Sequence, residues 1–306
     1  MISLILLEKI FSMFLIMCVA ALLVKTGVLK STDSKTISTL HVYAVTPCSI
    51  ILSFQVDFSK EIMKGLLISL IAGLVVYIFF FTASGLLSKA LKMESVERAS
   101  VIFPNALNLI IPLVSAVLGP EWIIYTSVFS SLQLIFLWSK GKAILCGDSK
   151  LDIKKIVTNP NIISIFIGLA CLLLKIKIPG PITSAMNSLA NCMGAMGMLI
   201  IGTILGGMDL KKVFTYKRVY LMSFLRLVVL PLPMVLLAKL VPLSIHPDVH
   251  NILLIVLLAC MAPTAVTISS MSALYGGDKE YASAIGIVSM CFCVITMPLM
   301  AALFQL

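Results

Sequence analysis

The sequence predicts an all-α polytopic membrane protein with ten transmembrane helices, and three observations support this fold class. Hydrophobic residues make up 60% of the 306-residue chain and charged residues only 12%, where a soluble domain has about 25%. The mean hydropathy is +1.12. Apolar stretches long enough to cross a bilayer recur along the whole chain, separated by short charged or Gly/Pro-containing loops. This composition excludes a water-soluble globule.

The apolar stretches form two sets of five. The first set lies at 10–24, 37–56, 66–87, 99–118 and 123–138, and the second at 162–174, 182–205, 219–240, 252–274 and 281–304. The longest polar stretch separates them, so we divide the chain into a first half at 1–138, a linker at 139–158 and a second half at 159–306. The first stretch lacks a basic leader and a clear cleavage site, so we interpret it as a retained helix and not a signal peptide.

The distribution of basic residues predicts the topology, because Lys and Arg collect in cytoplasmic loops. The loops after odd-numbered spans hold sixteen Lys and Arg residues, whereas the N-terminus and the other loops hold six. Both termini are therefore expected outside and the linker in the cytoplasm. The net charge of +10 reports this topology and predicts no nucleic-acid partner. The eight cysteines show no metal-binding or paired spacing and predict neither a metal site nor disulfides.

The two halves correspond to one another. DFSK from Asp57 matches DLKK from Asp209, and Pro112 matches Pro263, each at an offset close to half the chain length. Five spans per half make the two copies cross the membrane in opposite directions. The sequence therefore predicts a 5+5 inverted repeat, an arrangement that many secondary transporters share.

Prolines interrupt the fourth and ninth spans at matching positions. In the fourth span Asn105 and Asn108 lie between two prolines, the second of which is Pro112, and in the ninth Thr264 and Thr267 follow Pro263. Proline frees backbone carbonyls that lipid cannot satisfy, so such a break must face protein or a water-filled cavity. Either break alone is more often a simple kink, but the matched pair predicts a substrate site.

Buried charge limits what this site can bind. All thirteen acidic residues lie in loops or close to span ends, so the core offers no carboxylate for a cation. Arg226, inside the eighth span, either extends to the cytoplasmic surface or serves an anion. The partial charges at the ends of the four half-helices nearly cancel and do not determine the sign of the substrate's charge. The amide and hydroxyl donors favour carboxylate oxygens. Pro47 in the second span is a further candidate at the border of the cavity. The GxxxG at Gly202–Gly206 predicts either helix packing or a dimer contact.

Several motifs resemble the auxin efflux carrier family over essentially the whole chain. They are FPNALNLIIPLVSAVLGPEW from Phe103, NPNIISIFIGL from Asn159, MLIIGTILGGMDL from Met198, FLRLVVLPLPM from Phe224 and LLACMAPTAVTISSMSALYGGDKEYASA from Leu257. The resemblance implies helices four and nine crossing at their prolines, in a fold like that of the NhaA antiporter and the bile-acid symporters. It also implies a scaffold of helices one, two, six and seven, a transport domain of helices three to five and eight to ten that slides as an elevator, and a homodimer in a bacterial inner membrane.

These observations lead to an expected function and to three alternatives. We expect an efflux carrier for a small organic carboxylate, without a cofactor, in which Asn105, Asn108, Thr264 and Thr267 contact the substrate. A sodium- or proton-coupled symporter of the bile-acid-symporter type remains open, because the carbonyls of broken helices can hold Na⁺. A non-transporting membrane sensor or scaffold is a third possibility. An enzyme is not expected, because the spans contain no nucleophile with a base and no pair of acids.

Overall fold

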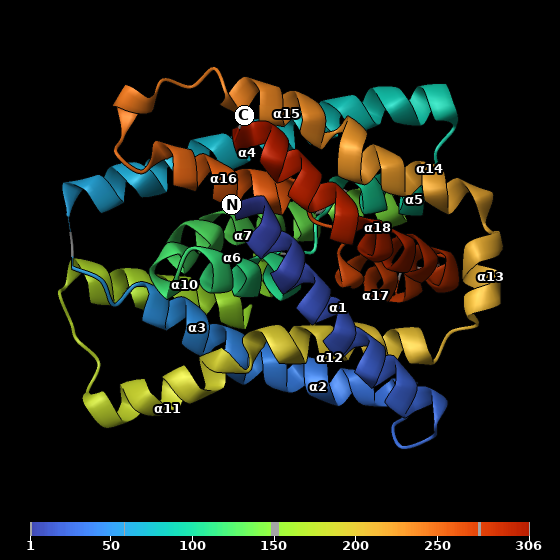
Figure 1. Ribbon diagram of the computed structural model, residues 1–306, viewed down its shortest axis with the longest axis horizontal. Helices are drawn as coiled ribbons and strands as arrows, with labels where there is room; N and C mark the ends of the chain where they lie inside the picture. The colour runs from blue at the N-terminus through green and yellow to red at the C-terminus, as the bar shows by residue number, and fades with distance from the viewer. Residues whose placement is uncertain (1, 58, 148–152, 275–276, 306) are drawn as a thin grey trace.

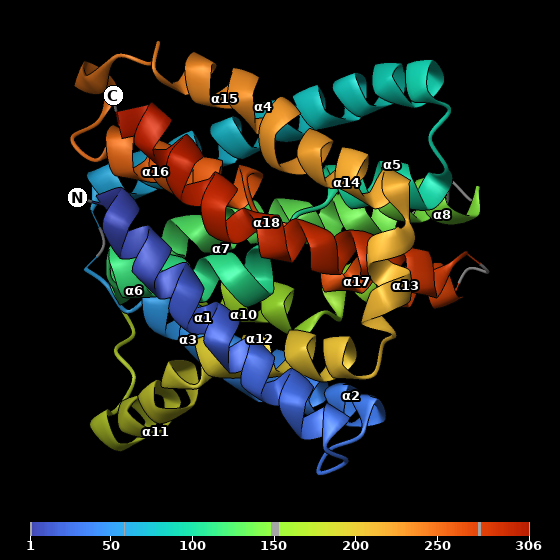
Figure 2. The same cartoon turned by 45° about the vertical axis from the view of Figure 1, so that its right-hand side comes forward.

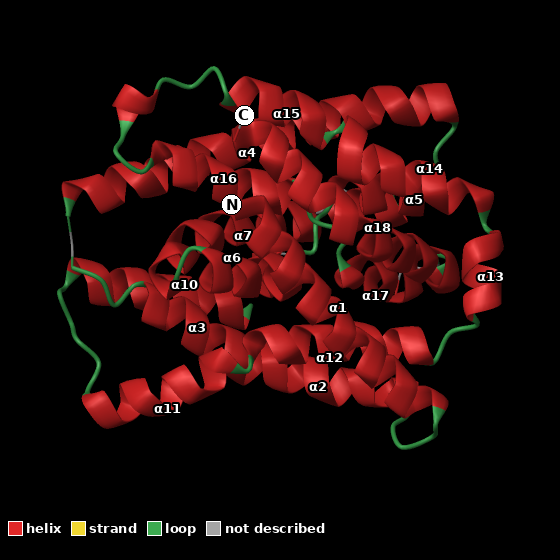
Figure 3. Ribbon diagram, viewed as in Figure 1, coloured by secondary structure: helices red, strands yellow, loops and turns green. Residues whose placement is uncertain are grey.

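The computed structural model describes residues 2–57, 59–147, 153–274 and 277–305, and every regular element within them is a helix (Figure 3). Seven helical stretches in this part of the chain are long and apolar enough to cross a bilayer. Three shorter apolar helices, Asn108–Val117, Pro160–Leu173 and Val249–Cys260, lie at the fourth, sixth and ninth expected spans. The all-α membrane fold is therefore confirmed, with helices at all ten expected positions, while the inverted repeat stays a prediction.

The first half forms five helical passages. They are α1 (Ile2–Lys25); α2 (Ser34–Leu40), η2 (His41–Val45) and α3 (Thr46–Ser53) in direct succession; α4 (Lys60–Leu91); α5 (Ser95–Ile102) followed by η3 (Ala106–Ile110) and α6 (Ile111–Val117); and α7 (Ile123–Phe136), η5 (Leu137–Gly141) and α8 (Lys142–Cys146). Short 3-10 turns η1 (Ser31–Asp33) and η4 (Pro120–Trp122) join them. The fifth passage continues to Cys146, so the beginning of the stretch that we expected as a linker is helical.

The second half also forms five helical passages. They are α10 (Pro160–Leu173); α11 (Gly180–Asn191) with α12 (Met193–Gly206); α14 (Lys217–Phe224), η6 (Leu225–Val229) and α15 (Pro231–Ala238); α16 (Val249–Cys260) with α17 (Val266–Leu274); and α18 (Lys279–Gln305). The short helices α9 (Ile153–Val157) and α13 (Leu210–Thr215) and the turn η7 (Leu243–Ile245) lie between passages.

Three widened helical turns have a common cause in the sequence. The π-type turns η2, η3 and η6 each end two residues before a proline, namely Pro47, Pro112 and Pro231. A proline has no N–H group, and its ring collides with the carbonyl group four residues earlier, so a π turn relieves the collision. Asn108 and Arg226, both candidate site residues, lie on such turns.

The loops gather at two opposite ends of the helix bundle. In Figure 1 the connections α3–α4, α10–α11 and α15–α16 lie at the left, while the α1–α2 loop, the α4–α5 connection and α13 lie at the right. Figure 2 shows both termini at the left edge, opposite α8 and α13. The termini therefore share one side of the membrane, and the loops that carry most of the basic residues lie on the other.

Glycines on α12 bring two neighbouring helices unusually close. A Cβ atom on Gly202 would collide with the carbonyl oxygen of Met17 on α1, and one on Gly206 would lie 2.6 Å from that of Ala21. The GxxxG motif thus packs α12 against α1 of the same chain. One and a half turns earlier, a Cβ atom on Gly197 would lie 2.6 Å from the carbonyl oxygen of Asn108. The same helix therefore touches the widened turn of the fourth passage.

Candidate functional site

Two interrupted helices meet inside the bundle. The fourth passage stops at Ile102 and resumes at η3, and the ninth stops at Cys260 and resumes at α17. Between these half-helices the two chains pair as an isolated antiparallel bridge of Pro104 with Thr264. The backbone N–H of Asn105 donates to Pro263 O at 2.7 Å, and that of Ala265 donates to Phe103 O at 3.0 Å. We call residues 103–105 and 263–265 the crossing.

Carbonyl groups that the first break frees are satisfied by donors from other helices. Ser100 O accepts from the Thr264 hydroxyl at 3.0 Å, and Val101 O accepts from Nη1 of Arg226 at 3.3 Å. Pro104 O accepts from Nε2 of Gln133, on α7, at 2.5 Å. Because an unpaired carbonyl is costly in an apolar interior, these contacts hold the half-helices apart in a defined geometry.

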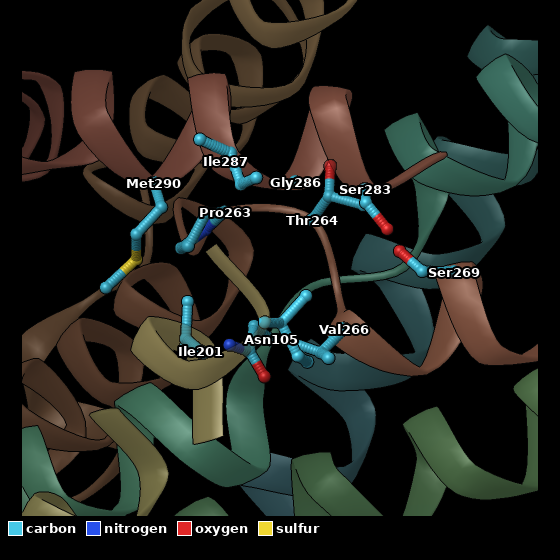
Figure 4. Close-up of a pocket in the computed structure, with 11 residues that line it drawn as sticks. Asn105, Ile201, Pro263, Thr264, Val266, Ser269, Ser283, Gly286, Ile287 and Met290 are labelled. Atoms are coloured by element: carbon cyan, nitrogen blue, oxygen red, sulfur yellow. The ribbon is translucent and has the colours of Figure 1, made fainter. Parts of the chain in front are cut away.

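The second break has a similar support from α18. The backbone N–H of Thr264 donates to the hydroxyl oxygen of Ser289 at 3.1 Å, and that hydroxyl donates to Gly286 O at 2.8 Å. The two hydrogen-bond donors of Thr264, its backbone N–H and its hydroxyl, are therefore occupied, although the residue still lines a cavity at the crossing (Figure 4).

The two asparagines lie together. Nδ2 of Asn108 donates to Oδ1 of Asn105 at 3.0 Å, as their spacing of three residues predicts. The structure gives neither amide another hydrogen bond to the described residues. The amide NH₂ of Asn105, the second N–H of the Asn108 amide and the Asn108 amide oxygen thus keep hydrogen-bonding capacity for a ligand.

A small cavity lies at the crossing. Its volume is about 30 Å³, roughly the share of one water molecule in the liquid. Figure 4 shows an apolar side with Ile201, Ile287 and Met290 and a side with the hydroxyls of Ser269 and Ser283. Asn105, Pro263 and Thr264 complete the lining together with Ile204, Val266 and Gly286. This cavity holds water in its present shape but not a carboxylic acid.

A larger cavity of about 850 Å³ adjoins the small one. We call it the vestibule. It shares Ile204, Val266, Ser269 and Ser283 with the small cavity and extends between α2 and η1 on one side and α17 and α18 on the other. Hydroxyl groups from Ser31, Thr32, Ser34, Ser38, Thr39 and Ser270 line it, with Lys35 and Glu280. The crossing is thus next to a wide polar space on the side of the α1–α2 loop.

Other expected site residues lie apart from the small cavity. Pro112 lines a cavity of about 270 Å³ on the opposite face, with Lys9 and Asn191. Thr267, the second residue of α17, is half-buried but lines neither cavity, and Pro47 is half-buried on α3. Of the expected residues, the structure therefore places Asn105, Pro263 and Thr264 at the small cavity, with Asn108 bonded to Asn105.

Arg226 contacts the last turn of α5, next to the crossing but outside the lining of the small cavity. Its side chain is 0% exposed, so it does not extend to the membrane surface, and it does not line the small cavity. Besides its bond to Val101 O, the guanidinium lies 5.2 Å from the ring centroid of Phe80, and its Nε and Nη2 atoms have no hydrogen-bond partner among the described residues.

Sequence reasoning did not identify Gln133 or its neighbours on α7. Gln133, Ser130 and Thr126 are buried on one face of the helix, and each has one side-chain oxygen that no other residue in the described part of the chain hydrogen-bonds. Their spacing of three and four residues was a visible signal, because it places three polar side chains on one face of an otherwise apolar helix.

Glu97 is a buried acid at the start of α5. The sequence predicted acidic residues only in loops or close to the ends of spans, and it did not predict that one of them is buried. Its side chain is 1% exposed and accepts from Nε and Nη2 of Arg218, each at 2.7 Å. It also accepts from the Tyr281 hydroxyl at 2.6 Å and the Glu94 backbone N–H at 2.9 Å. Burial acts to raise its pKa, but these donors outweigh burial and hold the pKa below its usual value. The carboxylate ties α5 to α14 and α18 and is saturated, so it is not open to a cation.

Comparison with protein families fits this geometry. The family model described as membrane transport protein matches residues 5–150 and 147–301, nearly the whole chain. The chain belongs to the auxin efflux carrier family of membrane transport proteins. It is therefore a multi-pass membrane transport protein and not an enzyme. No curated protein matches it significantly.

Proposed function

We propose that this auxin efflux carrier family member exports a small organic carboxylate by alternating access, with the crossing as its substrate site. The observation that carries the proposal is the cavity at the crossing, where free amide groups meet a hydroxyl-lined vestibule. Amide N–H groups bind carboxylate oxygens, while the apolar side formed by Ile201, Ile287 and Met290 suits a short carbon chain.

In this proposal the residues have distinct roles. Asn105 and Asn108 hold the carboxylate, and Thr264 and Thr267 contact the substrate once the small cavity widens. The breaks lie at Pro104 and Pro263, while Pro112, which the sequence suggested as the origin of the first break, instead follows the widened turn η3 inside the helical segment after it. Pro47 borders the path, because it lies on the same passage as the vestibule residues of α2.

An elevator motion is the mechanism that we propose. The passages of α1, α2–α3, α10 and α11–α12 form the scaffold, and the remaining passages form the transport domain, as an inverted repeat. The contact of Gly197 with Asn108 supports this division, because a glycine surface lets one body slide past another without interlocking side chains. The bonds of Glu97 to α14 and α18 support it too, since they join passages of the proposed transport domain.

The proposed orientation follows from the positions of the basic loops. The vestibule lies beside Lys35 in the α1–α2 connection, which the charge distribution assigns to the cytoplasm. The structure would then be open to the cytoplasm, with both termini outside and the protein in a bacterial inner membrane. A homodimer completes the proposal.

A sodium-coupled importer is the second candidate, and α7 favours it. The unpaired oxygens of Thr126, Ser130 and Gln133 are uncharged ligands of the kind that Na⁺ accepts, and they lie on the face from which Gln133 reaches the crossing. Water molecules could occupy the same oxygens. Transport that requires Na⁺ would favour this candidate.

The decisive experiment is flux across proteoliposomes. Vesicles containing the purified protein would be loaded with radiolabelled malonate, acetate or indole-3-acetate, in Na⁺ or in N-methylglucamine buffer. The proposal expects efflux of at least one acid that is equal in the two buffers. Uptake only in Na⁺ would select the second candidate, and no flux of any carboxylate would favour a non-transporting sensor.

A further inference from the structure

Arg226 carries a full positive charge in the interior of the bundle. A guanidinium keeps its proton in proteins, and in the described part of the chain no carboxylate pairs with it. The titratable groups that interact with it are Tyr77, Cys260 and Cys293, which are neutral at physiological pH. A lone charge in this setting costs several kcal/mol on general grounds, so its surroundings must compensate it.

Two helix ends provide that compensation. Val101, whose carbonyl Arg226 contacts, lies in the last turn of α5, and the nearby Cys260 is the last residue of α16. The C-terminal end of a helix carries about half a negative charge. The two ends that stop at the crossing therefore amount to about one negative charge, which one guanidinium balances.

The opposite half-helices are not balanced in this way. The helical segments that begin at Ala106 and Val266 start on the other side of the break, and Val266 lines the small cavity. Each N-terminal end carries about half a positive charge. Without Arg226 the partial charges of the four helix ends would nearly cancel. With Arg226 in place, the partial positive charges of the two N-terminal ends are left uncompensated.

We propose that Arg226 neutralises the C-terminal ends of α5 and α16 and thereby makes the cavity at the crossing attract anions. Arg226 acts from behind the crossing as a positioning residue and does not touch the substrate. The inference rests on the proposed function in taking the crossing as the substrate site, and it assigns the cause of the preference for a carboxylate. It also separates Arg226 from a membrane-surface role, because the side chain is fully buried.

The local potential can be measured without knowing the substrate. Ser269 lines both the small cavity and the vestibule, so the variant Ser269→Cys offers a thiol beside the crossing. Its rates of reaction with an anionic and a cationic methanethiosulfonate reagent are measured in purified protein. The parent chain, which keeps its native cysteines, gives the background. The ratio of the anionic to the cationic rate reports the sign and size of the potential.

Three backgrounds separate charge from hydrogen bonding. Arg226→Lys keeps the charge, and Arg226→Gln keeps an N–H donor for Val101 O but removes the charge. We expect the ratio to stay near the parent value with Arg226→Lys. We expect it to fall about tenfold with Arg226→Gln, which corresponds to roughly 1.4 kcal/mol. Cys260→Asp, which leaves the arginine in place and adds a carboxylate near it, should lower the ratio as well.

The outcomes are distinct. If the ratio stays at the parent value in Arg226→Gln, Arg226 only caps a carbonyl and the inference is wrong. If Arg226→Gln does not fold, the ratio in Cys260→Asp decides in the same way. If the ratio falls in Arg226→Gln but the parent protein transports no carboxylate, the role of Arg226 in charge balance is supported and the proposed function is wrong. If the parent exports a carboxylate but the ratio is unchanged in Arg226→Gln, the proposed function is supported and the role of Arg226 is wrong.

Discussion

Replacing Glu97 by glutamine should destabilise the protein and change its response to acid. The carboxylate accepts two hydrogen bonds from Arg218 and one each from Tyr281 and the Glu94 backbone. A neutral amide loses the charge-assisted character of the two arginine bonds, each worth about 1.5 to 3 kcal/mol, and its NH₂ group faces donors. Arg218 is half exposed, so water recovers part of the loss. We expect a net loss of about 3 kcal/mol in the free energy of unfolding.

The pH dependence of this effect has a defined sign. The pKa of Glu97 lies below its usual value of 4.5 in the folded protein, so the unfolded chain binds the proton more readily. The stabilisation is therefore complete above about pH 4.5 and is lost as the pH falls through the lower pKa of the folded state.

Thermal unfolding in detergent measures both effects. Glu97→Gln should lower the melting temperature by several degrees at neutral pH, and the difference from the parent should shrink in acid. Glu8→Gln is the matched control, because Glu8 is exposed and should change neither value. A neutral-pH melting temperature equal to that of the parent would show that the three hydrogen bonds from Arg218 and Tyr281 do not join α5 to α14 and α18 as described.

Two further predictions concern motion between the proposed scaffold and transport domain. Gly197→Ala should reduce transport about tenfold, because its Cβ would lie 2.6 Å from the carbonyl oxygen of Asn108. Gly180→Ala is the control and should transport normally, because its Cβ has no atom within 4 Å. Equal initial rates of the two variants in a flux assay would contradict the sliding contact. Cys18 lies on α1 and Cys291 on α18, and these two helices pack against one another. A short bifunctional maleimide that cross-links the two cysteines should stop transport in the parent but not in Cys18→Ser, and full transport by a protein shown to be cross-linked would exclude movement at this contact.

The sequence predicted those parts of the fold that depend on hydrophobic length and on proline. Helices occupy the expected spans in order, and the breaks near Pro104 and Pro263 meet. The helices and the breaks follow from local chemistry, because an apolar stretch must be helical in lipid and a proline removes a backbone donor from the helix. That the two breaks meet was implied only by the resemblance to the family.

The partners of polar groups could not be predicted, because they come from residues far apart in the chain. Gln133 reaches Pro104 O from a different helix, and Arg226 reaches Val101 O across more than a hundred residues. The burial of Glu97 has the same origin, since Arg218 and Tyr281 come from different passages. Sequence position alone made Glu97 look like one more acid near the end of a span.

The pairing at the crossing also limited the interpretation of threonine. Thr264 is a hydroxyl donor in the sequence, but in the structure its hydroxyl donates to Ser100 O. Thr264 lines the small cavity together with two residues that the sequence did not single out, Ser269 on α17 and Ser283 on α18. Which hydroxyls face a cavity depends on helix rotation and on competition from freed carbonyls, and neither can be obtained from spacing alone.

The central claim is that solute binds at the crossing through the Asn105 amide, and carboxylate efflux by Asn105→Ala tests it most directly. Efflux from proteoliposomes would be compared with that of Asn187→Ala, which removes an exposed amide on α11. Both variants should purify with the parent's thermal stability and oligomeric state. The account predicts loss of efflux in Asn105→Ala and parental efflux in Asn187→Ala; parental kinetics in Asn105→Ala would contradict it.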